Sequence, residues 1–339
     1  MTSAINFLFT VFFLTGCTTF SEFFQSDNIR YDNTSLSIQT INLFNQNGSS
    51  TITGRSWKSD WLFRRERLEI IDDSFRQTKP DIIVFQEMLS KKGNPSESDF
   101  NILSKSSLKG YTWDVIPVDE LSDSRELEYH GVATSFPVSV VTQPETNQFF
   151  WQIGQNGYMS LTILNFENHQ NILIFNLNMP SLSNQNDFQI YNNIEEYIRK
   201  FLSDNTTYCA KRIVIAGYIP SSPISVNYKR FLDNLELKDS SLGFCQTASD
   251  CYTGTNLNDL YLAAYGETLP EQLDRILVHR SALISSSNVF FNIPKESTQY
   301  LKTYGITKLW PSKRFGWRTT LRFSRCELND KKPVTNKNL

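Results

Sequence analysis

The chain of 339 residues is long enough to bury a large core, and a composition of 40% hydrophobic and 13% aromatic residues excludes a disordered protein. The 33 basic and 35 acidic residues give a formal net charge of -2, which is no electrostatic footprint for nucleic acid. We therefore expect no nucleic-acid partner, although a local basic patch is compatible with this balance.

The N-terminal segment reads as a targeting signal. Residues 5–17, INFLFTVFFLTGC, form an apolar run too short to span a bilayer and of the right length for a signal-peptide core. The run ends in LTGC, which is typical of a bacterial lipobox, so residues 1–17 are predicted to be a lipoprotein signal with Cys17 as the acylated residue. The leading MTSAIN carries no Lys or Arg, and an ordinary signal peptide with an incidental cysteine is the alternative.

This signal predicts where the protein works. We expect a bacterial cell-envelope protein that a lipid anchor holds at the outer membrane or the surface, with secretion as the alternative. The membrane is then a partner through the anchor. Residues 18–35 are predicted to be a linker, 36–326 one domain, and 327–339 a polar C-terminal tail.

In an oxidising compartment the cysteines are expected to form disulfides. Four remain after Cys17, and an even number in a secreted protein favours disulfides. Cys245 and Cys251 enclose the short loop CQTASDC and form the favoured pair, whereas the pairing of Cys209 with Cys326 stays open. Four buried thiols are the alternative, and the spacing fits no zinc site.

Strands and helices follow in chain order from residue 35. Residues 35–44 have the content of a strand, 60–80 the periodicity of a helix, and 81–87, DIIVFQE, the continuous apolar run of a strand buried on both faces. Residues 131–141 and 158–166 are expected to form an antiparallel pair. Further strands are predicted at 171–179, 212–219, 272–280 and 316–323, and a second helix at 184–204. Strands that outnumber the helices between them predict two stacked sheets with helices outside.

Several segments together resemble the endonuclease/exonuclease/phosphatase superfamily, which has the DNase I-like fold. They are TINLFNQN, PDIIVFQEM, GVATSFPV, NILIFNLNMPS, RIVIAGYIP, EQLDRILV and PSKRFGWRTTLRF, and they cover roughly residues 36 to 323. The segment CYTGTNLNDLYLAAYGETLPEQLDRILVH is similar to the bacterial and neutral sphingomyelinase branch. The resemblance implies a four-layered α/β sandwich of two mainly antiparallel sheets flanked by helices. It also implies phosphodiester hydrolysis with a divalent cation, usually Mg²⁺, held by oxygen ligands.

Three positions of the family's site are kept. Asn42 stands at the asparagine of the first strand and Glu87 at the metal-ligand glutamate of the QE motif. Asp274 stands at the aspartate that orients the catalytic histidine. Each side chain also has a structural alternative, because each can satisfy backbone groups or end a buried strand.

Five other positions are replaced. The family's NTHL is NLNM here, its GDFN is GYIP, and its terminal SDH is SKR. His130, His169 and His279 all lie outside the motifs. The replaced positions carry Asn178, Tyr218, Pro220, Lys313 and Arg314.

Lys313 and Arg314 suggest how the altered site is filled. An ammonium group beside Glu87 would replace the metal by an ion pair, and a guanidinium beside Asp274 would form a bidentate pair. The alternative is that both cations lie on an exposed turn at the edge of the sheet.

Two functions remain open. The first is a sphingomyelinase-like pseudoenzyme that keeps the fold, needs no cofactor and binds a protein or phospholipid partner. The second is a divergent Mg²⁺-dependent phosphodiesterase acting on a phospholipid, with groups such as Tyr218 or Asp187 entering the site. A nuclease fits the slightly acidic, anchored chain least. Trp310, Phe315 and Trp317 are predicted to be core residues rather than a membrane-inserting edge.

Overall fold

A computed structural model gives the fold. It describes residues 32, 34–43, 50–52, 55–57, 61–91, 98–120, 126–135, 139–140, 150–154, 157–165, 170–180, 187–255, 271–292, 294–296, 302, 308–312 and 315–326. All of them belong to one compact unit, Tyr31–Leu339. The predicted signal with Cys17 and the cations Lys313 and Arg314 lie outside the described residues.

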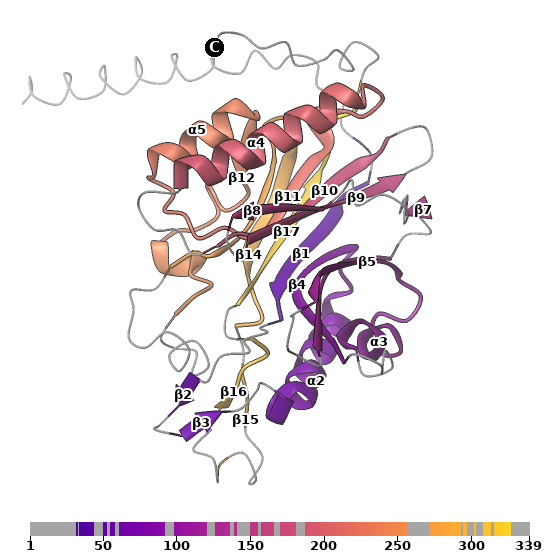
Figure 1. Cartoon of the computed structure of the whole chain (residues 1–339), viewed down its shortest axis with the longest axis vertical. Coiled ribbons are helices and arrows are strands. Elements are labelled where there is room, and N and C mark those ends of the chain that lie inside the picture. The colour runs from indigo at the N-terminus through magenta and orange to yellow at the C-terminus, as the bar shows by residue number, and fades with distance from the viewer. Residues whose placement is uncertain are drawn as a thin grey trace, which may run out of the picture. The chain divides into compact units, whose positions relative to one another are not determined.

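Two β-sheets form the centre of this unit (Figure 1). The first sheet has the order β14 (Leu283–Phe290), β17 (Gly316–Arg322), β1 (Leu36–Asn42), β4 (Ile82–Lys91), β6 (Glu126–Thr134) and β5 (Thr112–Glu120). The second has the order β12 (Leu237–Asp239), β13 (Asp274–His279), β11 (Ile213–Tyr218), β10 (Ile172–Asn178), β9 (Gly157–Asn165) and β7 (Ser139–Val140), and β8 (Phe150–Gly154) also pairs with β9. Two short hairpins, β2 (Ser50–Ile52) with β3 (Arg55–Trp57) and β15 (Lys295–Glu296) with β16 (Lys308–Leu309), complete the described strands.

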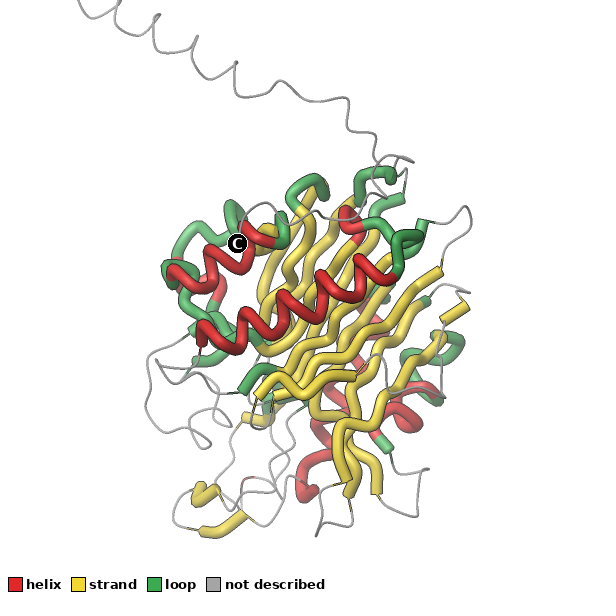
Figure 2. The backbone as a smooth tube through the Cα atoms, turned by 45° about the horizontal axis from the view of Figure 1, so that its top comes forward, coloured by secondary structure: helices red, strands yellow, loops and turns green. Residues whose placement is uncertain are grey.

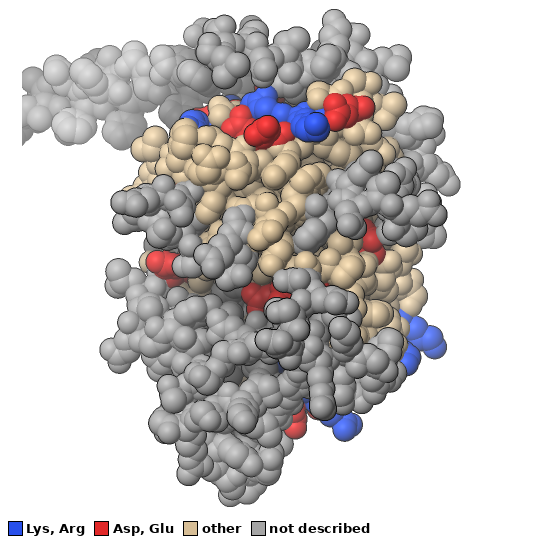
Figure 3. Space-filling model, in the orientation of Figure 1, with Lys and Arg blue, Asp and Glu red and all other residues tan. Residues whose placement is uncertain are grey.

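The helices lie on the outer faces of the sheets, and Figure 2 shows the long α4 crossing the strands of the second sheet. They are α2 (Trp61–Thr78), α3 (Asp99–Ser104), α4 (Asp187–Asp204) and α5 (Val226–Asn234), with single 3₁₀ turns η4 (Ala210–Arg212) and η5 (Ala248–Cys251). On the face in Figure 3, side chains of both charges gather over α4, and much of the other described surface there is uncharged.

Three hydrophobic clusters separate four layers. One packs α4 and α5 on the second sheet, one fills the space between the sheets, and one packs α2 and α3 on the first sheet. The alternation along single strands explains this, because Ile38 of β1 faces the other sheet while Ile41 faces α2. The predicted four-layered sandwich is therefore confirmed. Most strand pairs are antiparallel, and each sheet holds one parallel pair, β1 with β4 and β10 with β11.

One predicted strand pairing holds only in part. Residues 131–134 belong to β6, which pairs with β4 and β5 in the first sheet, whereas residues 139–140 form β7 and pair antiparallel with β9 as predicted. Pro137 follows β6 in the sequence, and a proline cannot donate to a strand ladder. The segment that reads as one strand therefore contributes to both sheets.

Two disulfides link distant and local parts of the chain. Cys209 pairs with Cys326 across a separation of 117 residues, and Cys245 pairs with Cys251 across 6. On the chain-entropy model the long link contributes about 5 kcal/mol and the short one about 2 kcal/mol. Trp310, Phe315 and Trp317 are buried, with 6%, 6% and 0% of their surface exposed, so they are core residues.

No helix among the described residues has both the length and the apolar character needed to cross a bilayer.

Candidate functional site

Five strands, β1, β4, β10, β11 and β13, carry most of the motif positions that the structure describes. Strands β1 and β4 run parallel, so Asn42 lies beside Gln86 and next to Glu87. In the second sheet Asn178 of β10 lies beside Tyr218 of β11. The first residue of β13, Asp274, lies opposite Tyr218.

Buried hydrogen bonds tie these two groups of strand ends to each other. Gln86 Nε2 donates to Asn176 Oδ1 over 2.9 Å and to Thr40 Oγ1 over 3.1 Å, which joins β4 of one sheet to β10 of the other. Gly217 makes room for this contact, because a Cβ there would lie 2.0 Å from the Leu177 carbonyl oxygen and 3.1 Å from Gln86 Nε2. The motif residues of both sheets therefore meet at one end of the sandwich.

Glu87 occupies an unusual backbone conformation. It has a φ of 53° and lies where the register between β4 and β6 shifts, between Phe85 and Met88. Such a bulge turns a side chain away from the alternation of the strand. The half-buried carboxylate accepts a hydrogen bond from Asn42 Nδ2, with 2.8 Å between Nδ2 and Oε1.

A cation lies close to Glu87 on the side of α2. Arg67 is 4% exposed, donates to the Leu43 carbonyl over 3.2 Å, and lines with Glu87 a cavity of about 10 Å³. Asp99 lines the same cavity and accepts a hydrogen bond of 2.6 Å from the backbone N–H of Leu89. A cavity of this size holds about one water molecule.

His130 is a buried histidine whose pKa is influenced by the charge of Glu87. Only 1% of its surface is exposed, and its Nδ1 lies 3.3 Å from Ser160 Oγ. Burial lowers the pKa of His130 to about 4, while the charge of Glu87 acts in the opposite direction. The imidazole is therefore neutral at pH 7, and it is shut off from the solvent that a proton shuttle needs.

Asp274 is fully buried at the start of β13. Its backbone N–H and that of Leu273 both donate to Thr253 Oγ1, over 2.9 Å and 2.8 Å. Thr253 belongs to the CYTG segment, so a side chain of that segment holds the backbone of Asp274 in place. Asp187, by contrast, begins α4; burial raises the pKa of the nearby Tyr191, and the charge of Asp187 adds to that rise.

The neighbours of Lys313 and Arg314 are anchored at this same site. Ser312 Oγ donates to the Asn42 carbonyl over 2.5 Å, and the Phe315 N–H donates to the Thr253 carbonyl over 2.8 Å. Ser312 is thus hydrogen-bonded to Asn42, which also binds Glu87, and Phe315 is hydrogen-bonded to Thr253, which also holds Asp274.

Among the residues that the structure describes, the side chains at the motif positions do not fit a magnesium site. Mg²⁺ prefers near-octahedral oxygen ligands, chiefly carboxylates and water. The amide of Asn42 turns its nitrogen toward Glu87, and Asn178, Tyr218 and Pro220 offer no carboxylate. No group of three His, Cys, Asp or Glu side chains suited to a metal occurs among the residues that the structure describes.

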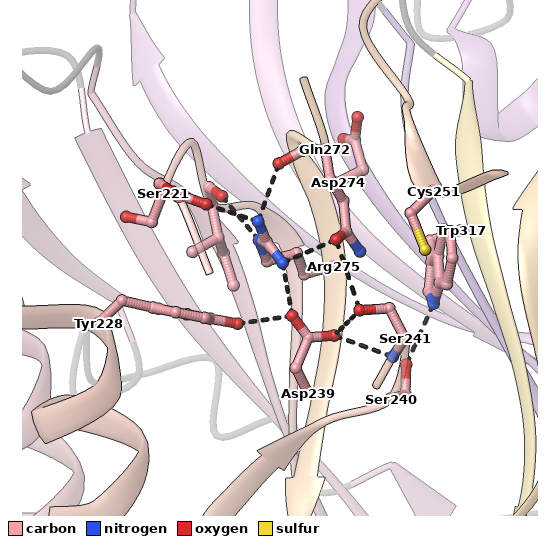
Figure 4. Close-up of polar contacts among 12 residues, drawn as sticks. Ser221, Tyr228, Asp239, Ser240, Ser241, Cys251, Gln272, Asp274, Arg275 and Trp317 are labelled. Carbon is pink, nitrogen blue, oxygen red and sulfur yellow. Dashed lines mark hydrogen bonds and ion pairs between the residues drawn. The ribbon is translucent and has the colours of Figure 1, made fainter. Parts of the chain in front are cut away.

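A buried charge network behind the site escaped the sequence analysis (Figure 4). Arg275 and Asp239 are 0% and 1% exposed and form an ion pair of 2.5 Å, and Tyr228 donates to Asp239 over 2.8 Å. Burial alone would lower the pKa of Arg275, but the negative charge of Asp239 raises it. The sequence signal that could have predicted this network is the arginine within the apolar strand LDRILV, because a buried charge needs a partner.

Comparisons with known proteins agree with the topology. An endonuclease/exonuclease/phosphatase family protein of Bacteroides thetaiotaomicron has a TM-score of 0.60 at 17% identity, covering 87% of this chain and 97% of its own. The mannosyl-6-phosphatase of B. thetaiotaomicron VPI-5482 has a TM-score of 0.59 at 16% identity, covering 84% and 99%. A family protein of Leptotrichia buccalis C-1013-b has a TM-score of 0.54 at 16% identity, covering 84% and 98%.

The chain has the endonuclease/exonuclease/phosphatase fold. No protein-family model and no curated protein sequence matches it. At these identities the shared endonuclease/exonuclease/phosphatase fold fixes the architecture, while activity depends on the side chains at the site.

Proposed function

We propose that this chain is a lipid-anchored cell-envelope protein whose phosphoesterase-like site no longer hydrolyses phosphate esters and serves in binding. The observation that carries the proposal is the set of side chains at the strand ends. Asn178 and Tyr218 lie side by side where the resemblance expects a histidine and an aspartate, and Pro220 replaces an asparagine. An amide cannot accept a proton near neutral pH, and proline has no group that orients a water molecule.

The charge balance around Glu87 supports the same proposal. Asn42 donates to its carboxylate, and Arg67 lines the cavity beside it. The anchored neighbours Ser312 and Phe315 support the alignment of SKR with the family's terminal motif. On this proposal Lys313 pairs with Glu87 and Arg314 with Asp274, and basic side chains take the place of the metal.

The sphingomyelinase-like origin is a finer part of the proposal. Thr253 of CYTG accepts hydrogen bonds from the backbone of Leu273 and Asp274, so the two ends of the segment that resembles sphingomyelinases are in direct contact. The expected partner is a protein or a phospholipid.

The cell-envelope location is likewise a proposal. The LTGC sequence at Cys17 and the two disulfides support it, because structural disulfides persist in oxidising compartments.

Hydrolysis assays with purified protein test the proposed function. Sphingomyelin vesicles, bis-p-nitrophenyl phosphate and p-nitrophenyl phosphate are each incubated with Mg²⁺ and with wild type or Glu87→Gln. We expect the two proteins to give the same background rate. Turnover by wild type that is lost in Glu87→Gln would show the alternative function, a divergent Mg²⁺-dependent phosphodiesterase.

A further inference from the structure

A second cavity lies on the opposite side of β13 from the candidate site. Asp274 and Arg275 are consecutive residues of this strand, so their side chains point to opposite faces. Arg275 lines a pocket of about 480 Å³, which lies within the usual size range of small-molecule sites. Pro220 and the residues that follow it form one wall, so the pocket lies next to the candidate site. Glu87 is not among its lining residues.

The walls of this pocket are held in place by Arg275. Its Nη2 donates to the Ser221 carbonyl over 2.5 Å, its Nε donates to the Ile219 carbonyl over 3.3 Å, and its Nη1 donates to Gln272 Oε1 over 2.9 Å. Asp239, its ion-pair partner, accepts hydrogen bonds from the N–H and the hydroxyl of Ser241. One buried guanidinium thus fixes three wall segments, and a preformed pocket loses little free energy in ordering itself around a ligand.

The fourth wall is the disulfide loop between Cys245 and Cys251, and most of the surface around the pocket is apolar. Cys245, Cys251, Pro223 and Leu242 line it. Leu242 is 60% exposed and Ile224, next to Pro223, is 77% exposed, so apolar surface continues from the pocket onto its rim. An exposed apolar surface that surrounds a pocket is a feature of binding sites.

The charges of the pocket disfavour anions. Among the described residues that line it, only Glu271 and Arg275 are charged. All five N–H groups of Arg275 are used, because Nη1 also pairs with Asp239 and Nη2 also donates to the Gln272 carbonyl over 3.1 Å. Glu271 is exposed and leaves the pocket with a negative charge that is not balanced within it.

We propose that this pocket binds an uncharged or cationic small molecule with an apolar body, and that it does not bind phosphate esters. The apolar walls bury the body of the ligand, and the serine hydroxyls and Glu271 meet its polar groups. This function is separate from that of the Glu87 site, so either one can fail without the other.

Two dyes with one skeleton test the proposal. N-phenyl-1-naphthylamine is uncharged, and 8-anilinonaphthalene-1-sulfonate is the same molecule with an added sulfonate. Fluorescence titration of the full chain is expected to show saturable binding of the uncharged dye at one site. The sulfonate should bind about tenfold or more weakly, and Glu271→Gln should narrow that difference because it removes the negative charge of the pocket.

Three further variants locate the binding. Ser222→Trp places an indole in the exposed wall next to Ser221, and Leu242→Ala removes part of the apolar wall. Each variant should lower the affinity for the uncharged dye about tenfold. Ser203→Trp adds the same indole at an exposed position of α4 and should bind like wild type, as should Glu87→Gln. Non-saturable binding, equal affinity for the two dyes, or wild-type affinity in both Ser222→Trp and Leu242→Ala would overturn the proposal.

Discussion

Asn42 Nδ2 donates a hydrogen bond of 2.8 Å to Oε1 of Glu87, so the amide at the end of β1 satisfies the carboxylate on the bulge of β4. Only 1% of the surface of Asn42 is exposed, which keeps this contact away from bulk water. A hydrogen bond to a charged group contributes about 1.5–3 kcal/mol. The pair therefore stabilises Glu87 as a carboxylate by means of a protein group.

Asn42→Asp should convert this pair into two facing carboxylates. We expect the free energy of unfolding at pH 7 to fall by about 3 kcal/mol, because a donor is lost and a like charge is gained. Added Mg²⁺ should recover part of the loss, since two carboxylates begin a metal site. Urea unfolding with and without Mg²⁺ measures both effects, and Asn42→Ala is the uncharged control. An Asn42→Asp protein as stable as wild type at pH 7 would contradict the role of Asn42.

A double-mutant cycle tests the proposed pair of Glu87 and Lys313. Lys313→Met should cost roughly 3–5 kcal/mol of unfolding free energy, because it leaves Glu87 charged without its partner. Adding Glu87→Gln should recover much of that loss. The same cycle with Arg314→Met and Asp274→Asn tests the second pair. Strictly additive effects in urea unfolding would show that the cations lie on an exposed turn instead.

Removing one member of the buried pair of Arg275 and Asp239 should be strongly destabilising. Arg275→Met leaves the Asp239 carboxylate buried beside Tyr228, and we expect a loss of about 3–5 kcal/mol. Asp239→Asn should cost a similar amount, and the double variant should cost less than the sum of the two. Arg280→Met is a matched control, because its ion pair with Asp233 is 51% and 71% exposed and should contribute less than about 1 kcal/mol.

His130 predicts a loss of stability in mild acid. Its pKa is about 4 in the folded protein and 6.5 when unperturbed, so the unfolded chain binds more protons between these values. The stabilisation is complete above pH 6.5 and declines as the pH falls toward 4, by up to about 1.4 kcal/mol per pH unit. Urea unfolding of wild type and His130→Gln at several pH values separates the contribution of His130 to the pH dependence of stability from that of His279. Burial also lowers the pKa of His279. Parallel curves for the two proteins would contradict the contribution of His130.

The sequence predicts the central strands because their burial leaves a direct signal. β4, β10 and β11 are covered on both faces, so they read as continuous apolar runs, and α2 and α4 show helical periodicity. β14 was missed because its LISSSNVF sequence is mostly polar and partly exposed. The 131–141 run was misassigned because periodicity does not reveal which sheet a strand joins.

The candidate site also has residues that the sequence predicts and residues that it does not. Motif order predicted Asn42, Glu87 and Asp274 as site residues, and their role at the site stays a prediction. The contacts of Arg67 and Thr253 join residues far apart in the sequence, and the packing of α2 and of the segment around Thr253 against the strands brings them to the site. The pairing of Arg275 with Asp239 likewise spans 36 residues and two strands.

Isothermal titration calorimetry of Mg²⁺ against the metal-free full chain tests the central claim most directly. If protein groups rather than a metal balance the charge of Glu87, wild type and Glu87→Gln give the same featureless heats up to millimolar Mg²⁺. Saturable binding by wild type that disappears in Glu87→Gln would contradict the account.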